Sequence, residues 1–247
     1  MLFVTGDTHG DFTALTRFAA ETPLTRGDYI LICGDFGGVW SGDKKERRRL
    51  DRLEALPCTV LFVDGNHENF DRLEKLPVEE WQGGKIHAVR PHVLHLMRGQ
   101  LFQIDGHTLF TMGGAASHDI SDGILSPSDV DYEENRAAMR SSGMKFRTLH
   151  RDWWPRELPS AAEYEQARRV LASINWKVDY IVTHCAPTSL QTDMNPREFT
   201  PDALTDFLEE VREKLDFRGW YFGHYHEDRD FPGGFHLLYH RFIPIFS

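Results

Sequence analysis

The sequence is poor in cysteine: it has three, Cys33, Cys58 and Cys185, among 247 residues. An odd number at wide spacing argues against a disulfide framework and against a zinc knuckle, whose ligands lie close together in the chain. Each of the three lies in or beside an apolar run. We therefore expect all of them to be buried as small hydrophobic side chains.

Long apolar runs are also absent, and none approaches the ~20 residues of a membrane-spanning helix. Residues 1–7 lack the basic region of a secretory signal, and their apolar stretch is shorter than such a signal needs. We therefore predict a cytoplasmic protein that does not bind membranes. Hydrophobic residues nevertheless make up 40% of the chain, which suffices for a sizeable core.

Positive charge is in deficit, since the formal net charge is −10 with histidine neutral. An acidic surface repels nucleic acid, so we do not expect extensive nucleic-acid binding. A phosphate substrate is not excluded, because bound dications reverse the local field. The basic run at residues 44–49 contains Glu46 and precedes leucines at helical spacing. We interpret it as the solvated face of an amphipathic helix and not as a nucleic-acid site.

Short, β-rich apolar runs alternate with helix-like patterns through most of the chain. Strands are expected at 2–5, 29–33, 59–63 and 180–183, with closing strands at 220–222 and within 235–245. The first helix is expected over residues 12–20. This alternation predicts an α/β fold whose parallel strands are joined by right-handed crossovers.

Local signals place further elements. Asp105-Gly106 predicts a hairpin turn within an antiparallel stretch from Lys85 to Met112. Ser160 followed by Glu163 is a capping box, which predicts the start of a helix. Thr200-Pro201 predicts another helix start, with proline at the first helical position.

The segment from Gly114 to Pro159 is polar and shows no strand-helix rhythm. We predict one domain over residues 1–247, with this segment, at about 114–159, as an insertion that shapes the substrate site. Trp153 and Trp154 lie within it, and two alternatives stay open for them. The rings either stack on a substrate base or anchor the loop to the core.

Acidic, amide and imidazole side chains follow directly after the predicted strands. They are Asp7, His9, Asp35, Asn66, His67, His184, His224 and His226. In an open α/β sheet, ligands bind beyond the carboxyl ends of the strands, so we expect these side chains to meet at one edge. Residues two apart on an extended segment share a side, so Asp7 with His9, and His224 with His226, are each expected to converge. The donor types suit Mn²⁺, Fe²⁺ or Zn²⁺.

These residues form five ordered blocks that resemble the calcineurin-like metallophosphoesterase superfamily. The blocks are Asp-x-His at 7–9, Gly-Asp at 34–35, Gly-Asn-His-Glu at 65–68, His184, and Gly-His-x-His at 223–226. The last block is similar to that of the compact bacterial branch. The resemblance implies a four-layer αββα sandwich, in which two mixed β-sheets are flanked by helices.

The resemblance also implies a site for two divalent metal ions. Manganese is expected first, with iron, zinc, nickel or cobalt as alternatives. In that pattern Asp7, His9 and His226 hold the first ion, Asn66, His184 and His224 hold the second, and Asp35 bridges both. His67 binds no metal and lies near the leaving group as the general acid.

The implied reaction is hydrolysis of a phosphoester by a hydroxide that bridges the two ions. The favoured interpretation is a phosphomonoesterase acting on a small molecule, a nucleotide or a phosphoprotein. The alternative is a phosphodiesterase or nuclease acting on nucleotides or nucleic acid. A non-catalytic metal-binding scaffold comes third, because the complete ligand set and His67 argue against it. His118, directly after a predicted strand, is a candidate substrate-binding residue, since loops often carry function.

Overall fold

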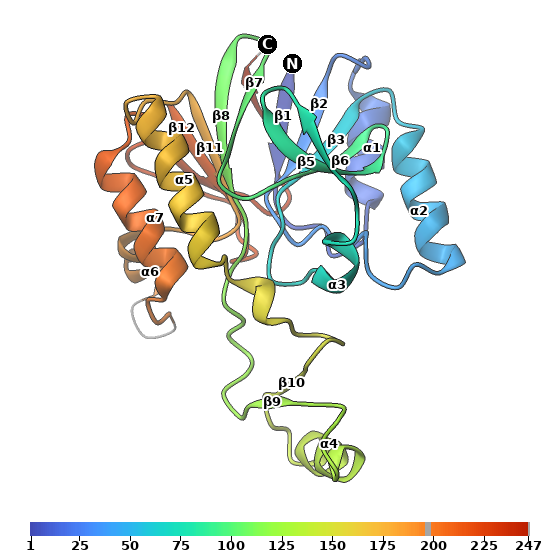
Figure 1. Cartoon of the computed structure of the whole chain (residues 1–247). Coiled ribbons are helices and arrows are strands. Elements are labelled where there is room, and N and C mark those ends of the chain that lie inside the picture. The colour runs from blue at the N-terminus through green and yellow to red at the C-terminus, as the bar shows by residue number, and fades with distance from the viewer. Residues whose placement is uncertain (196–198, 247) are drawn as a thin grey trace.

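The computed structural model describes residues 1–195 and 199–246. Two β-sheets lie face to face, with helices on the outer surface of each (Figure 1). The predicted α/β fold and its four-layer αββα arrangement are confirmed. None of the helices in this described part of the chain is long and apolar enough to cross a membrane.

The first sheet is mixed. Its spatial order is β15 (Ile243–Phe246), β1 (Leu2–Thr5), β2 (Tyr29–Ile32), β3 (Thr59–Phe62), β6 (Val93–Leu96), β5 (Gly84–Arg90) and β4 (Val78–Trp81). Strands β1, β2, β3 and β6 are parallel, whereas β15, β5 and β4 pair antiparallel toward the edges. Helices α1 (Thr13–Glu21) and α2 (Lys44–Glu54) cover its outer face, and the short α3 (Phe70–Leu73) follows β3.

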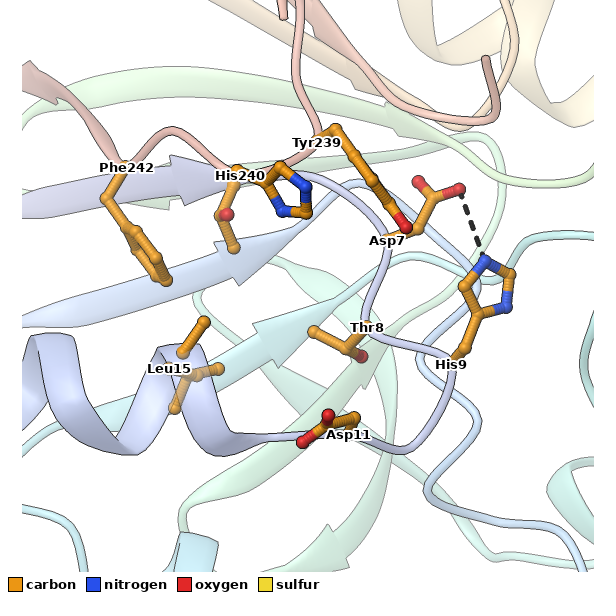
Figure 2. Close-up of a pocket in the computed structure, with 10 residues that line it drawn as sticks. Asp7, Thr8, His9, Asp11, Leu15, Tyr239, His240 and Phe242 are labelled. Atoms are coloured by element: carbon orange, nitrogen blue, oxygen red, sulfur yellow. Dashed lines mark ion pairs between the residues drawn. The ribbon is translucent and has the colours of Figure 1, made fainter. Parts of the chain in front are cut away.

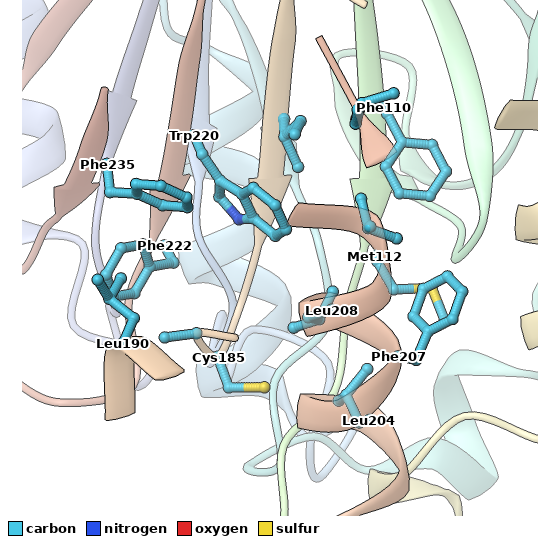
Figure 3. Packing of buried hydrophobic residues seen from close by; sticks show 14 of the residues in the cluster. Phe110, Met112, Cys185, Leu190, Leu204, Phe207, Leu208, Trp220, Phe222 and Phe235 are labelled. Carbon is cyan, nitrogen blue, oxygen red and sulfur yellow. The ribbon is translucent and has the colours of Figure 1, made fainter. Parts of the chain in front are cut away.

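The second sheet is mixed as well. Its order is β13 (Arg229–Phe231), β14 (Phe235–Leu237), β12 (Gly219–Phe222), β11 (Tyr180–Thr183), β8 (His107–Met112) and β7 (Gln100–Ile104). Helices α5 (Ala161–Ser173), α6 (Thr188–Met194) and α7 (Ala203–Lys214) cover its outer face. Figure 3 shows this core, where Trp220 and Phe222 of β12 share one cluster with Leu208 of α7.

Alternation along each strand sends its side chains into two different cores. In β1, Val4 joins the core between the sheets, whereas Phe3 packs with the helices outside. In β11, Val182 faces the first sheet and Ile181 packs with α5 and α7. Burying each such side chain contributes about 1.5–3 kcal/mol. Both faces of these strands are covered, so they read in the sequence as continuous apolar runs.

Several local predictions are confirmed. Asp105 and Gly106 form the turn between β7 and β8, both with positive φ, at 48° and 81°. Ser160 and Glu163 form the capping box that begins α5. The three cysteines are buried and free.

The predicted start of the helix at Thr200-Pro201 is wrong, because α7 begins at Ala203. The Asp202 carboxylate accepts the backbone N–H groups of Leu204 and Thr205 at 2.7 and 2.9 Å. These amides have no partner within the first turn of the helix, so an aspartate that satisfies two of them sets the start.

Residues 114–159 hold more regular structure than the sequence indicates. They contain β9 (Ile124–Leu125), α4 (Tyr132–Ser141), β10 (Arg147–Thr148) and a 3₁₀ turn at Pro155–Glu157. The interpretation of this segment as irregular is therefore wrong for α4. In α4 only Tyr132 is buried, so the helix lacks the apolar stripe by which helices are recognised in a sequence. Strands β9 and β10 and helix α4 extend away from the sandwich (Figure 1).

Trp154 connects this segment to the core. Its side chain is 1% exposed, and its Nε1 donates to the Asp71 carboxylate at 2.8 Å. Its ring also meets Trp40 edge-on, with centroids 5.4 Å apart. Of the two alternatives left open for the tryptophans, anchoring of the loop therefore applies to Trp154.

Candidate metal centre

The predicted site residues lie beyond the carboxyl ends of five strands. Asp7 and His9 follow β1, Asp35 follows β2, Asn66 and His67 follow β3, His184 follows β11, and His224 and His226 follow β12. Strands β1, β2 and β3 are neighbours in one sheet, and β11 and β12 are neighbours in the other. The two sheets therefore deliver their loops to a common edge.

Two groups of side chains at this edge could each hold a metal ion. The first is Asp7, His9 and His226, and the second is Asp7, Asp35 and His184. Within each group, one potential ligand atom per residue lies within 4.8 Å of the others. Asp7 belongs to both groups, so the two positions adjoin.

In the first group, carboxylate and imidazole atoms approach closely. Asp7 Oδ2 lies 3.2 Å from His226 Nε2 and 3.8 Å from His9 Nε2, and the two imidazole nitrogens are 3.0 Å apart. Figure 2 shows Asp7 and His9 facing each other, with Tyr239 beside Asp7. The Tyr239 ring stacks on the ring of His226, with centroids 4.8 Å apart. Tyr239 therefore holds the orientation of His226.

The second group is completely buried. His184 Nε2 lies 3.4 Å from Asp35 Oδ1 and 3.3 Å from Asn66 Oδ1. Its other nitrogen, Nδ1, donates to the carbonyl oxygen of Cys33 at 2.7 Å. That hydrogen bond keeps a proton on Nδ1, so Nε2 is the nitrogen that faces the site and that would bind a metal ion after losing its own proton.

Asp35, a member of the second group, also faces the first group. Its Oδ1 is the atom near His184, whereas its Oδ2 lies 3.8 Å from His9 Nε2. The backbone N–H of His67 donates to Oδ1 at 2.8 Å, which fixes the carboxylate. Each oxygen of Asp35 thus faces a different group.

His224 does not share the direction of His226. Its Nε2 lies 3.0 Å from His118 Nε2, and its ring meets that of His184 with centroids 4.9 Å apart. The extended conformation expected for the segment of His224 and His226 is wrong, because both residues have positive φ, at 72° and 52°. The structure thereby places His118, the candidate substrate-binding residue, against the site.

Backbone strain concentrates at this edge. His9 and Asp35 each have φ of 46°, and the two histidines after β12 also have positive φ. A residue with a Cβ atom in that region costs of order 1 kcal/mol or more, and such strain gathers at functional sites. Gly65 meets a related constraint, since a Cβ there would lie 2.1 Å from Asp35 Oδ1. Glycine is therefore required where the chain passes the carboxylate.

A buried chain of hydrogen bonds orients Asn66. Asn66 Nδ2 donates to Ser117 Oγ at 3.2 Å, and Ser117 Oγ donates to Glu157 Oε2 at 2.6 Å. The backbone N–H of Ser117 also donates to Glu157, at 3.0 Å. Because the amide nitrogen faces Ser117, the amide oxygen of Asn66 faces His184.

The electrostatics of the site favour a bound cation. Burial opposes a charge on His184, but Asp35 and Asp7 outweigh it and raise the pKa of the imidazole to about 10. Burial likewise disfavours a charged Asp35, yet His184, His67 and His9 hold its pKa well below the usual range. The buried carboxylates therefore attract positive charge, which the proton on His184 supplies here and which a divalent ion would supply in its place.

His67 lies at the rim of the two groups. Its ring meets that of His9 edge-on, with centroids 5.4 Å apart. The pKa of His67 is lowered from its usual value, chiefly by burial and also by the charge of Arg147, although Asp35 opposes this shift. Arg147 belongs to β10 and is held by Asp119 through two contacts, at 3.0 and 2.5 Å. The segment 114–159 thus brings charge close to His67.

No sequence motif marks Ser117, Glu157 or Tyr239, although each contacts a candidate ligand or supports a residue that does. The position of Ser117 next to His118 was the one available signal.

The burial of Arg49 differs from the interpretation of the basic run at residues 44–49 as a solvated helix face. Arg49 is half-buried and lines a cavity together with His9 and His67.

Residues 2–228 match a family model described as calcineurin-like phosphoesterase. The comparison with curated proteins finds no match. The matched range includes every residue of both candidate metal-binding groups.

Proposed function

The chain belongs to the calcineurin-like phosphoesterase family, and from this membership we propose that it is a phosphomonoesterase with a manganese pair in its active site. The family consists of metal-dependent hydrolases of phosphoric esters, and the Asp/His cluster fits a dinuclear divalent site. The proposed ligands are Asp7, His9 and His226 for one ion, Asn66, His184 and His224 for the other, and Asp35 for both.

The observation that carries the ligand assignment is the position of Asp35. Its two carboxylate oxygens face His9 on one side and His184 on the other. A carboxylate can bridge two ions, whereas an imidazole nitrogen serves one. Manganese is proposed because carboxylate and amide oxygens occur beside imidazole nitrogens in the set.

Bound divalent ions supply Lewis acidity toward phosphate oxygens and a water molecule of lowered pKa. The side chains orient what binds there. His67 is proposed to protonate the leaving oxygen, a task for which its imidazole is chemically suited and which is typically worth ~10²–10⁴-fold in rate. The hydrogen bond from its backbone to Asp35 holds the ring at a set position relative to the metal-binding groups.

Two features support a monoester as the substrate. The space beside His67 is a cavity of about 310 Å³, which suits a small leaving group better than a polynucleotide. The net charge of −10 also disfavours a long polyanion.

We also propose that residues 1–247 form one domain and that the insertion 114–159 shapes its substrate site. Within the insertion, Ser117 contacts Asn66 and His118 contacts His224. The charge of Arg147 acts on His67. The insertion therefore contacts the proposed ligands at two points and acts on His67 through the charge of Arg147.

The test is a paired assay with p-nitrophenyl phosphate and bis(p-nitrophenyl) phosphate. The protein is first freed of metal by chelation and then supplied with Mn²⁺, Fe²⁺, Zn²⁺, Ni²⁺ or Co²⁺ in turn. We expect no turnover without metal, recovery that is greatest with Mn²⁺, and a higher kcat/KM for the monoester. A higher kcat/KM for the diester would refute the phosphomonoesterase and favour the alternative function, a phosphodiesterase. Full activity after chelation would overturn the metal-dependent mechanism.

A further inference from the structure

The cavity beside His67 has two chemically different kinds of lining residue. Its lining residues are His9, Gly37, Trp40, Ser41, Arg49 and His67. His9 and His67 are histidines of the candidate centre. Trp40, Ser41 and Arg49 add an indole, a hydroxyl group and a guanidinium, which belong to α2 and the loop that precedes it.

Arg49 is held in place without a direct ion pair, although its charge helps to lower the pKa of Asp11 and of Asp43. One terminal nitrogen, Nη1, donates to the carbonyl oxygen of Gly10 at 2.8 Å, and Gly10 directly follows His9. Over residues 1–195 and 199–246, no carboxylate forms an ion pair with this guanidinium, and its buried Nε has no hydrogen-bond partner. By contrast, Arg147 and Arg156, which also lie near this edge, are paired with carboxylates.

Trp40 forms a fixed wall of the same cavity. Its backbone N–H donates to Glu46 at 2.9 Å, and its carbonyl oxygen accepts from Asn69 Nδ2 at 2.8 Å. Its half-buried ring meets the buried ring of Trp154 edge-on. Because its backbone is fixed at both the N–H and the C=O group and its ring packs on another ring, Trp40 presents a rigid apolar surface at little further cost in conformational entropy.

We propose that this cavity is the leaving-group subsite, and that Arg49 selects phosphoesters whose leaving group carries a second negative charge beside a ring. The inference rests on the proposed phosphomonoesterase function, in which the leaving oxygen lies beside His67. A leaving group attached there extends along Trp40 toward Arg49. Its distal anion then meets a half-buried guanidinium that forms no ion pair with a carboxylate of the described residues.

The expected preference is about tenfold in kcat/KM, because one charge-assisted hydrogen bond in a partly solvated place is worth roughly that factor. A suitable pair of substrates is phenyl phosphate and 4-carboxyphenyl phosphate. They share the phosphate and the ring, and they differ by one distal carboxylate.

The experiment measures the ratio of kcat/KM for these two substrates in the metal-loaded protein. We expect a ratio of about ten in the native protein, about one in Arg49→Met, and an intermediate value in Arg49→Lys, which keeps the charge but not the planar fork. Arg48→Met is the matched control, since Arg48 is exposed on the same helix, and it should keep the native ratio. An equal fall for both substrates in Arg49→Met would overturn the proposal and assign Arg49 to the scissile phosphate or to the loop at Gly10.

Calorimetry with benzylphosphonate and 4-carboxybenzylphosphonate, whose P–C bonds are not hydrolysed, separates the subsite from the reaction. Tighter binding of the carboxylated ligand by about tenfold, lost in Arg49→Met, supports the subsite even if neither phosphate ester is turned over. Preferential binding of the carboxylated phosphonate without turnover of either ester would refute the proposed phosphomonoesterase function and leave the subsite supported. Equal affinity of the native protein for both phosphonates, with normal hydrolysis of phenyl phosphate, would remove the subsite and leave the function intact.

Discussion

Replacement of Ser117 by alanine is expected to weaken the binding of one metal ion and to spare the other. Ser117 Oγ accepts the amide N–H of Asn66 at 3.2 Å, and this contact decides which end of the amide faces His184. Without the hydroxyl group, the buried amide nitrogen of Asn66 loses its partner. The amide can then rotate and present –NH₂ to the ion instead of oxygen.

The expected magnitude follows from this geometry. Leaving a buried polar group unsatisfied costs about 1–3 kcal/mol, and residues that orient metal ligands are typically worth 10–100-fold in affinity. We therefore expect the Kd of the ion proposed for Asn66, His184 and His224 to rise by about 10–100-fold in Ser117→Ala. Glu157→Gln should raise it by about tenfold, because it weakens the acceptor that orients the Ser117 hydroxyl group.

The assay is calorimetric titration of the metal-free variants with Mn²⁺, together with electron paramagnetic resonance of the loaded protein. A coupled manganese pair has a spectrum distinct from that of a single ion, so selective loss of one ion is visible directly. Glu46→Gln is the matched control. Glu46 is also a buried carboxylate that accepts backbone N–H groups, those of Trp40 and Ser41, but it contacts none of the proposed ligands. Native Kd values for both ions in Ser117→Ala and Glu157→Gln would refute the orienting role of this chain of hydrogen bonds.

Three further predictions concern single side chains. Asp35→Asn is expected to lower the content of both ions, and His226→Ala that of one, because the two oxygens of Asp35 face both groups whereas His226 faces one; two full equivalents in Asp35→Asn, by metal analysis, would exclude bridging. His67→Ala should keep both ions while kcat falls by ~10²–10⁴-fold, and most for poor leaving groups; an equal loss for good and poor leaving groups would exclude proton transfer. Burial and the neighbouring His95 lower the pKa of His87 to about 4, although Asp64 raises it. Near pH 5 the unfolded chain therefore holds a proton at this position that the folded chain lacks. The contribution to stability is complete above about pH 6.5 and is lost as the pH falls toward 4, by about 2 kcal/mol after allowance for solvent screening. When the free energy of unfolding is measured in urea at several pH values between about 4 and 6.5, His87→Gln should make it depend less on pH. A pH dependence equal to that of the native protein would contradict the role of His87.

Much of the fold could be predicted because its signals are local. Strands β1, β2, β3 and β11 are buried on both faces and therefore stand out as apolar runs. The polar residues that follow them could be assigned to one edge of the sheets, since parallel strands end together. Helix α4 escaped prediction for the opposite reason: it packs too little apolar surface to leave a periodic pattern.

The sequence by itself determined the fold class and the set of polar residues beyond the strand ends. Only the tertiary structure decided where those side chains point. His224 turns to His118 and His226 turns to Asp7, because left-handed backbone angles replace the extended conformation that the spacing indicated. Such angles are set by how the loops of two sheets pack against each other, and no local pattern encodes them.

The same distinction holds for the residues around the centre. Ser117 reaches Asn66 across 51 positions, and Arg49 reaches Gly10 across 39. A serine in a polar loop and an arginine in a basic run carry no signal of these contacts. They arise because the sandwich brings distant loops to one edge, where a buried hydrogen-bond donor or acceptor must find a partner among whatever side chains the fold places there.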